Sequence, residues 1–198
     1  MHSSNGRTAE VPLSQLRVAV LDAEVESREQ LVSAVAGVGL DVCVEGPLRP
    51  NIVGLIHGAA CDAALVGIDD PAGSPIRLAP DIECALILCS RNTGPDMMVA
   101  ARKMGATGFL VRPIRSKQIV PTLALATSIF REGQHLRRTL AERRTIEQAK
   151  GRVMERRGMT EDAAFHWLRR RAMDTRTRIA DVARDVLSEQ NTREGMSG

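Results

Sequence analysis

The amino-acid sequence predicts a chain in two parts, a doubly wound parallel α/β domain followed by a helical region. Two observations lead to this fold class. In residues 1–114, short apolar runs alternate with helical segments, which is the pattern of a parallel sheet covered by helices. In residues 115–198, apolar residues recur at helical spacing and no strand pattern interrupts them. A chain of 198 residues has room for both parts.

Five strands are predicted in the first half, at Arg17–Leu21, Asp41–Val44, Ala63–Ile68, Ala85–Cys89 and Gly108–Val111. Three helices are predicted between them, at Arg28–Gly37, Ile52–Ala60 and Asp96–Lys103. The proline-rich stretch 70–82 reads as a loop. The helix expected between the third and fourth strands is therefore short or absent.

Residues 116–150 predict one nearly continuous helix, with Pro121 in its first turns, where proline is tolerated. Four of its apolar residues are spaced 4-3-4, namely Ile119, Leu123, Ala126 and Phe130. This spacing fits a coiled-coil seam, and it fits equally well a helix that packs on its own sheet. Beyond Gly133 no sheet remains to pack on, so Leu136 and Leu140 favour contact with a second copy of the chain.

The remaining chain predicts three short amphipathic helices. Their apolar stripes consist of Ile146, Ala149 and Val153, then of Ala164, Phe165, Leu168 and Ala172, and last of Ile179, Val182, Ala183, Val186 and Leu187. Gly158 can adopt the left-handed conformation that ends the first of these helices, and Thr160 can cap the second. Three narrow stripes make a small core, so this unit needs support from a neighbour or a partner chain.

Charge divides the chain at the same place. Residues 1–114 hold nine basic and thirteen acidic side chains, a net charge of −4, whereas residues 115–198 hold eighteen and eleven, a net charge of +7. A basic half attached to an acidic half favours a polyanionic partner for the basic one. A basic surface that is only solvated is the alternative from charge alone.

The C-terminal stretch resembles the ANTAR domain, the RNA-binding module of the AmiR/NasT family of antiterminators. The matching residues are Gln148-Ala149-Lys150-Gly151, Met154, Gly158, Ala164-Phe165, Leu168-Arg169 and Ala172. The resemblance implies binding to a leader-RNA hairpin that prevents a terminator from forming. It also implies control by a protein partner, a ligand-sensing regulator that resembles solute-binding proteins.

The first half resembles the receiver domain of response regulators, a flavodoxin-like fold, in the degenerate form found in AmiR-like proteins. Receivers carry two acids after the first strand, a phosphoacceptor aspartate after the third and a Lys-Pro pair after the fifth. Here Asp22-Ala23, Gly67 and Arg112-Pro113 stand at these positions, with Ser90 or Cys89 at the place of the switch hydroxyl. We therefore expect no phosphorylation. Asp69 is a substitute acceptor only with a shifted strand end, and Asp22 with Glu24 offers at most a weak metal site.

Seven residues are candidates for RNA contact: Lys150, Arg169, Arg170, Arg171, Trp167, Arg176 and Arg178. Lys150 and Arg169 are at positions of the ANTAR motif. Trp167, Arg170 and Arg171 share a helix face, where an aromatic ring beside cations can stack a base and hold phosphates. Core packing is the alternative for Trp167, and a solvated face is the alternative for each arginine.

Other classes of function have little support in the sequence. It has no glycine-rich phosphate loop, no nucleophile elbow and no metal-ligand spacing, so we expect no enzyme, cofactor or metal. The cysteines Cys43, Cys61, Cys84 and Cys89 suggest reduced thiols of a cytoplasmic protein. No apolar run is long enough to span a membrane, and the polar start, Met1–Glu10, lacks the apolar core of a signal peptide.

The sequence thus predicts a homodimeric regulator with a pseudo-receiver at residues 14–130, a coiled-coil linker at 131–144 and an ANTAR domain at 145–190. Two rival functions are a DNA-binding response regulator and a coiled-coil interaction module that binds no nucleic acid.

Overall fold

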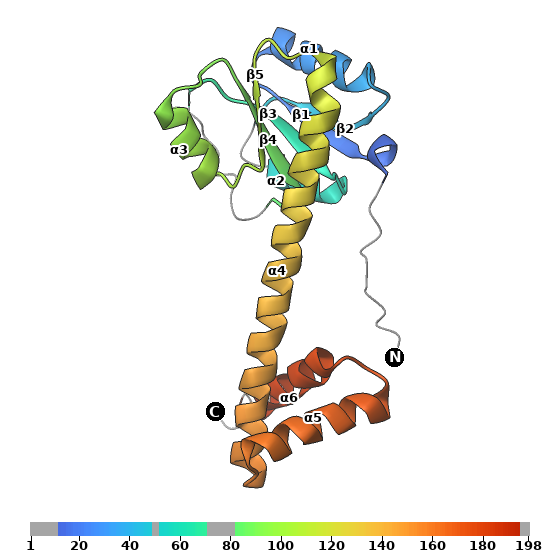
Figure 1. Cartoon of the computed structure of the whole chain (residues 1–198), viewed down its shortest axis with the longest axis vertical. Coiled ribbons are helices and arrows are strands. Elements are labelled where there is room, and N and C mark those ends of the chain that lie inside the picture. The colour runs from blue at the N-terminus through green and yellow to red at the C-terminus, as the bar shows by residue number, and fades with distance from the viewer. Residues whose placement is uncertain (1–11, 49–51, 71–81, 195–198) are drawn as a thin grey trace. The chain divides into compact units, whose positions relative to one another are not determined.

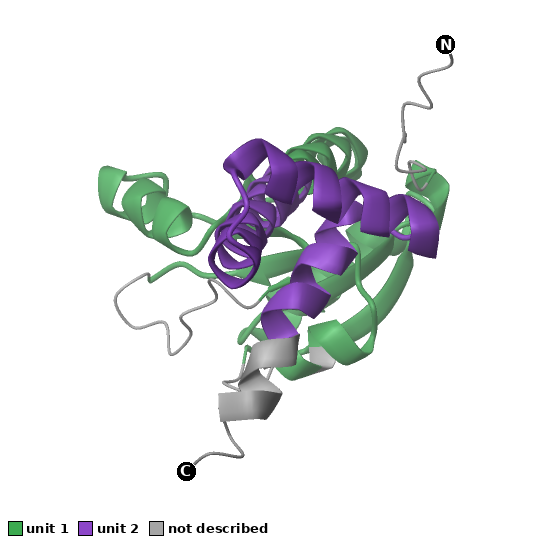
Figure 2. Ribbon diagram, turned by 90° about the horizontal axis from the view of Figure 1, so that it is seen from below, with its two compact units in different colours: residues 1–132 green, residues 133–198 purple. Residues whose placement is uncertain are grey.

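The computed structural model describes residues 12–48, 52–70 and 82–194. The chain forms two compact units, residues 1–132 and residues 133–198 (Figure 2). The predictions for Met1–Glu10 and for most of the 70–82 stretch concern residues outside these described ranges.

The first unit contains a five-stranded parallel sheet (Figure 1). Its strands are β1 (Arg17–Leu21), β2 (Asp41–Gly46), β3 (Ala63–Gly67), β4 (Ala85–Ser90) and β5 (Gly108–Val111), preceded by a short 3-10 turn at Leu13–Gln15. The order across the sheet is β2-β1-β3-β4-β5, which is the flavodoxin-like order. The fold class predicted from the sequence is confirmed, and all five predicted strands are present.

Alternate residues of each strand face two separate apolar cores, which is why the strands read as continuous apolar runs. On one face, Val18 of β1 and Leu65 of β3 pack with helix α1 (Val25–Ala36) and with the start of helix α4 (Ser116–Arg157). On the other face, Ala64 and Val66 pack with α2 (Ile52–Gly58) and α3 (Pro95–Lys103). Helices on both faces leave the carboxyl edge of the sheet as the place for a functional site.

The first part of helix α4 shows which of the two interpretations of its 4-3-4 stripe, a coiled-coil seam or packing on the sheet, is correct. Ile119, Leu123 and Ala126 are at most 1% exposed and belong to the core of the sheet, with Phe130 packed against them. This part of the stripe therefore packs on its own domain. Leu136 and Leu140 behave differently, because 59% and 57% of their surfaces are exposed.

The second unit consists of the last part of α4, helix α5 (Glu161–Thr175) and helix α6 (Ile179–Glu194). Its small core is built from the predicted stripes, with Ala149 and Val153 of α4, Leu168 of α5 and Ala183 of α6 among its buried residues. Only Phe165 departs from its stripe, since it is 41% exposed.

Two local signals define the turn between α4 and α5. Gly158 has φ of +60°, the left-handed conformation that ends a helix, and the Thr160 hydroxyl accepts a hydrogen bond from the Ala163 amide at 3.4 Å. Both features agree with the sequence prediction. No helix within the described parts of the chain combines the length and apolarity needed to cross a membrane.

Candidate functional sites

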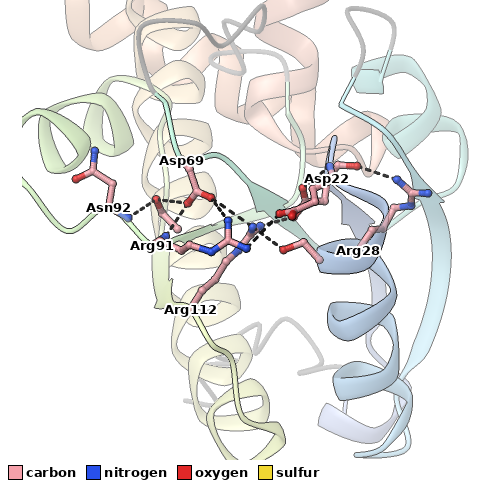
Figure 3. A network of polar contacts seen from close by, with 9 residues as sticks. Asp22, Arg28, Asp69, Arg91, Asn92 and Arg112 are labelled. Atoms are coloured by element: carbon pink, nitrogen blue, oxygen red, sulfur yellow. Dashed lines mark hydrogen bonds and ion pairs between the residues drawn. The ribbon is translucent and has the colours of Figure 1, made fainter.

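The carboxyl edge of the sheet gathers the residues that stand at the positions of a receiver phosphorylation site. Asp22 follows β1, Gly67 ends β3, Ser90 ends β4 and Arg112 follows β5. In a parallel sheet these ends meet at one edge, so residues up to ninety positions apart become neighbours. Figure 3 shows Asp22, Asp69, Arg91 and Arg112 joined there in one polar network.

The Arg112 side chain occupies the centre of this network. Its guanidinium forms a close ion pair with Asp22, donates to the Ser27 hydroxyl at 2.7 Å and lies 3.7 Å from Asp69. The Arg112 and Asp22 side chains are only 7% and 4% exposed. The Arg112 guanidinium thus neutralises Asp22, which stands where receivers carry a metal-binding acid.

Gly67 provides the space for this ion pair. A Cβ added to Gly67 would lie 2.0 Å from an Arg112 Nη and 2.0 Å from an Asp22 oxygen, far inside any normal contact. An aspartate at this position therefore cannot coexist with the Arg112–Asp22 pair as it stands. The glycine at position 67 and the arginine at position 112 therefore depend on each other for space.

Asp69, the substitute acceptor considered from the sequence, is held by several donors. Its carboxylate accepts hydrogen bonds from the Ser90 hydroxyl at 3.0 Å, from the Arg91 amide at 2.6 Å and from the Arg91 guanidinium at 2.8 Å. Burial by itself would raise the pKa of Asp69. The hydrogen bonds from Arg91 and Ser90 and the charges of Arg112 and Arg91 outweigh burial and lower this pKa below its usual value.

Ser90 and Glu24 also take part in this polar network. Ser90 donates its hydroxyl to Asp69, whereas Cys89 packs in the apolar core with Ile87 and Leu110, so Ser90 is the one of the two that faces the polar network. Glu24 pairs with Arg91 at 3.2 Å. Among the described residues, no three metal-ligating side chains of the His, Cys, Asp or Glu type come together.

A second site lies in the helical unit around Trp167. The guanidinium carbons of Arg157 and Arg171 are 4.6 and 5.5 Å from the centre of the indole ring. These three residues line a pocket of about 360 Å³ together with Arg156, Val153 and Val186. The pocket therefore joins an aromatic ring, three arginines and an apolar floor.

The local sequence explains this arrangement. Trp167 and Arg171 are one helical turn apart on α5 and share a face. Arg157 is the last residue of α4, and the turn at Gly158 brings it against α5. Within the described residues, no acidic partner is found for Arg156 or Arg157, so their charges remain available to a ligand.

The other candidate residues are distributed differently. The Lys150 ammonium lies 2.7 Å from Glu147 and 2.6 Å from Glu161, is 12% exposed, and its pKa is raised by hydrogen bonds to these two acids. Arg178 pairs with Glu142 at 2.6 Å. Both cations connect helices of the unit, so neither presents a free charge.

Arg169, Arg170 and Arg176 are exposed on the helical unit. Arg169 follows Trp167 by two residues and is therefore turned by about 200° around the axis of α5, away from the pocket. Arg170 is one turn after Trp167, on the pocket side. Arg176 has φ of 54° and ends α5. The structure thus brings Trp167 and Arg171 together and adds Arg156 and Arg157, to which the sequence assigns no specific role.

Comparison with known proteins agrees with this division of the chain. The family model described as ANTAR domain matches residues 134–187. The transcriptional regulatory protein PdtaR from Mycobacterium tuberculosis, in strains CDC 1551 / Oshkosh and H37Rv, is 30% identical over 187 residues, which cover 89% of this chain and 91% of the relative. The chain belongs to the family of ANTAR-containing transcriptional regulatory proteins.

Solved structures support the fold of the first unit of this ANTAR protein. The signal receiver domain of a modulated diguanylate cyclase from Desulfovibrio desulfuricans G20 is 17% identical, with a TM-score of 0.51 over 60% of this chain and 98% of the other. A pilus assembly-related protein from Burkholderia pseudomallei K96243 is 16% identical, with a TM-score of 0.50 over 60% and 93%. At these identities the likeness concerns the receiver-like fold alone.

Proposed function

We propose that this ANTAR protein is an antiterminator that binds a leader-RNA hairpin through its helical unit and prevents a terminator from forming. The observation that carries the proposal is the pocket around Trp167, where Arg157 and Arg171 lie against the indole ring. Arg156 and Arg157 add positive charge at its rim. The net charge of +7 in residues 115–198 provides the long-range attraction to a polyanion.

The chemistry of the pocket favours an unpaired nucleotide over a base-paired stem. Bases in RNA loops can leave the stack and lie on aromatic rings or guanidinium planes, while neighbouring phosphates accept hydrogen bonds from arginine. A volume of about 360 Å³ lies within the range of small-ligand pockets. Arg169, Arg170 and Arg176 would contact flanking phosphates, while Lys150 and Arg178 would hold the helices in place.

Antitermination then follows from competition between two folds of the same RNA. Binding lowers the free energy of the hairpin by RT ln(1 + [protein]/Kd), and the terminator loses population accordingly. A hundredfold excess of protein over Kd contributes about 2.7 kcal/mol, enough to change the ratio of two competing RNA folds by about a hundredfold.

Control by a protein partner instead of phosphorylation forms the second part of the proposal. The Arg112–Asp22 pair and the hydrogen bonds to Asp69 support it, because the groups that would bind a metal ion and a phosphoryl group are already engaged. The resemblance to the AmiR/NasT family favours a ligand-sensing partner of the solute-binding type. Exposed Leu136 and Leu140 support a homodimer through the linker, residues 131–144.

The test uses the fluorescence of Trp167, which is the only tryptophan in a chain without tyrosine. A hairpin RNA with a single-stranded loop is titrated into the full chain, next to a DNA duplex of matched stem sequence. A base stacked in the pocket should quench the emission at RNA concentrations where the duplex has no effect. Equal or tighter binding to the duplex would favour a DNA-binding regulator, and binding to neither would favour an interaction module.

Matched arginine substitutions show whether the pocket is the binding site. Arg157→Ala and Arg171→Ala should each weaken hairpin binding by roughly tenfold, as expected for a lost contact worth 1–3 kcal/mol. Arg143→Ala removes the same charge from an exposed position of α4 about four helical turns before Arg157, and it should change affinity by less than about twofold. Equal losses in all three variants would indicate a diffuse charge effect and contradict a specific pocket.

A further inference from the structure

Two of the four cysteines are in direct contact in the first unit. The sulfur atoms of Cys43, in β2, and Cys61, just before β3, lie 2.7 Å apart. The two thiols therefore share a hydrogen bond, in which either sulfur can be the donor.

The backbone of β2 directs Cys43 toward this contact. Val18 pairs with Val42, and the next residue of β1, Ala19, pairs with Val44, so Cys43 is the extra residue of a β-bulge. A bulge changes the direction of a side chain relative to the regular alternation of a strand. As a result, Cys43 and Val44 both pack on the core that contains Cys61.

The two thiols differ in their access to solvent. Cys43 is partly buried on an edge strand, whereas Cys61 is 8% exposed. Formation of a disulfide of about 2.05 Å would require the sulfurs to approach by only about 0.65 Å. Cys43 is therefore the more accessible member of the pair, and Cys61 is already in contact with it.

We propose that Cys43 and Cys61 form a reversible oxidation site whose substrate is a hydroperoxide. The Cys43 thiolate attacks the terminal peroxide oxygen, the O–O bond breaks, and the departing oxygen leaves as water or alcohol after taking up the thiol proton. Cys43 becomes a sulfenic acid. The Cys61 sulfur then attacks the Cys43 sulfur, its proton goes to the departing hydroxide, and a disulfide and a second water are formed. The two thiols supply two electrons, and these reduce the peroxide.

Burial assigns the order of these steps. It raises the pKa of Cys61 far above its ordinary value, helped by the hydrogen bond with Cys43, and raises the pKa of nearby Cys84 to about 12. These two thiols are poor first nucleophiles toward a peroxide. The more accessible Cys43 therefore reacts first, and Cys61 resolves the sulfenic acid. The resulting bond would fasten edge strand β2 to the start of β3 and close the segment 44–60, which contains α2.

The experiment treats the reduced full-length protein with a small molar excess of hydrogen peroxide, blocks the remaining thiols and digests it. Trypsin leaves both cysteines in one fragment, because Arg49 precedes a proline and the next basic residue is Arg77. Cleavage after Glu45 by a glutamyl protease separates them. We expect two fragments joined through Cys43 and Cys61, with a mass loss of two hydrogens per chain that dithiothreitol reverses.

Three variants make the outcome specific. Cys61→Ser should accumulate a sulfenic acid on Cys43 that a dimedone-type reagent traps, and Cys43→Ser should form no bridge. Cys84→Ser should form the bridge like the wild type. A bridge to Cys84 or Cys89, a bond between two chains, or intact thiols at peroxide levels that oxidise free cysteine would overturn the proposal. The wild-type fragment map decides even if a variant folds poorly.

Discussion

Replacement of Gly67 by alanine tests whether the buried Arg112–Asp22 ion pair fills the space at the carboxyl edge of the sheet. The added methyl group would lie 2.0 Å from atoms of both partners, whereas real Cβ contacts essentially never fall below 3.0 Å. At least one partner must therefore retreat by about 1 Å or more. Both side chains are more than 90% buried, so the displaced charge cannot turn into water without opening the edge.

The loss of folding stability expected for Gly67→Ala follows from the burial of the Arg112–Asp22 pair. Loss of one partner from a buried ion pair typically costs about 3–5 kcal/mol, because the other charge remains in a poorly solvated place. Domains of this size are stable by only about 5–15 kcal/mol, so we expect Gly67→Ala to lower the melting temperature of the first unit by roughly 10–20 °C. Far-UV circular dichroism is a suitable readout, because the only tryptophan is in the other unit.

Gly46→Ala provides a matched control at the end of β2. A Cβ at Gly46 would have nothing within 4 Å, so this variant should melt within about 2 °C of the wild type. The double variant Gly67→Ala with Arg112→Ala should cost less than the sum of its single changes, because the methyl group and the guanidinium compete for one space. If Gly67→Ala melts like Gly46→Ala, the edge adapts easily and the reasoning fails.

Four further predictions concern phosphorylation, dimer formation, RNA contact and pH dependence. Acetyl phosphate should add no phosphoryl group to the wild type or to Gly67→Asp; a stable adduct in intact-mass analysis would contradict this. Leu136→Asp with Leu140→Asp should convert a dimer to a monomer in sedimentation at micromolar concentration, and an unchanged mass would argue against a seam there. Arg169→Ala should reduce the slope of log binding constant against log salt concentration by about one unit, because one phosphate contact is lost. Lys150→Ala should weaken hairpin binding without changing this slope. Equal slopes for the wild type and both variants would refute a phosphate contact of Arg169. The hydrogen bond with Lys150 lowers the pKa of Glu161 below its ordinary value of 4.5. The stability that this pair gives the second unit is therefore present above about pH 4.5 and should be lost as the pH falls below it. Glu161→Gln should flatten this pH dependence of the melting temperature, measured by tryptophan fluorescence.

Much of the fold was predictable because it depends on local apolar patterns. Parallel strands covered on both faces appear as continuous apolar runs, and the structure places all five where the sequence predicts them. Strand and helix ends were less well defined, since β2 continues to Gly46 and α1 begins at Val25. The stripe at 119–130 was ambiguous in principle, because a helix on a sheet and a helix in a coiled coil show the same period.

The sites were harder to predict because they depend on contacts between distant residues. The sequence reveals an arginine where receivers carry lysine, but only the meeting of strand ends shows that Arg112 fills the space above Gly67. Arg157 is ten residues from Trp167, on the other side of the turn at Gly158, so helix periodicity does not connect them. The Cys43–Cys61 contact depends on a β-bulge, which leaves no pattern in apolar periodicity.

The ion pairs at the carboxyl edge of the sheet also bear on how this protein could be controlled. A two-state protein is shifted only by a ligand that binds its two states with different affinity, and a change from 1:99 to 99:1 requires a difference of about 10⁴. Phosphorylation normally supplies this difference through a new charge beside a metal ion. Here two guanidiniums already neutralise Asp22 and Asp69, so the carboxyl edge has little unbalanced charge left to respond. Under the proposed control by a partner, this difference would come from contacts that the partner makes in one state only, and the exposed side chains of Leu136 and Leu140 on α4 offer an apolar surface for them. Such a partner would compete with dimer formation at this surface, which makes the oligomeric state the first quantity to measure when it is added.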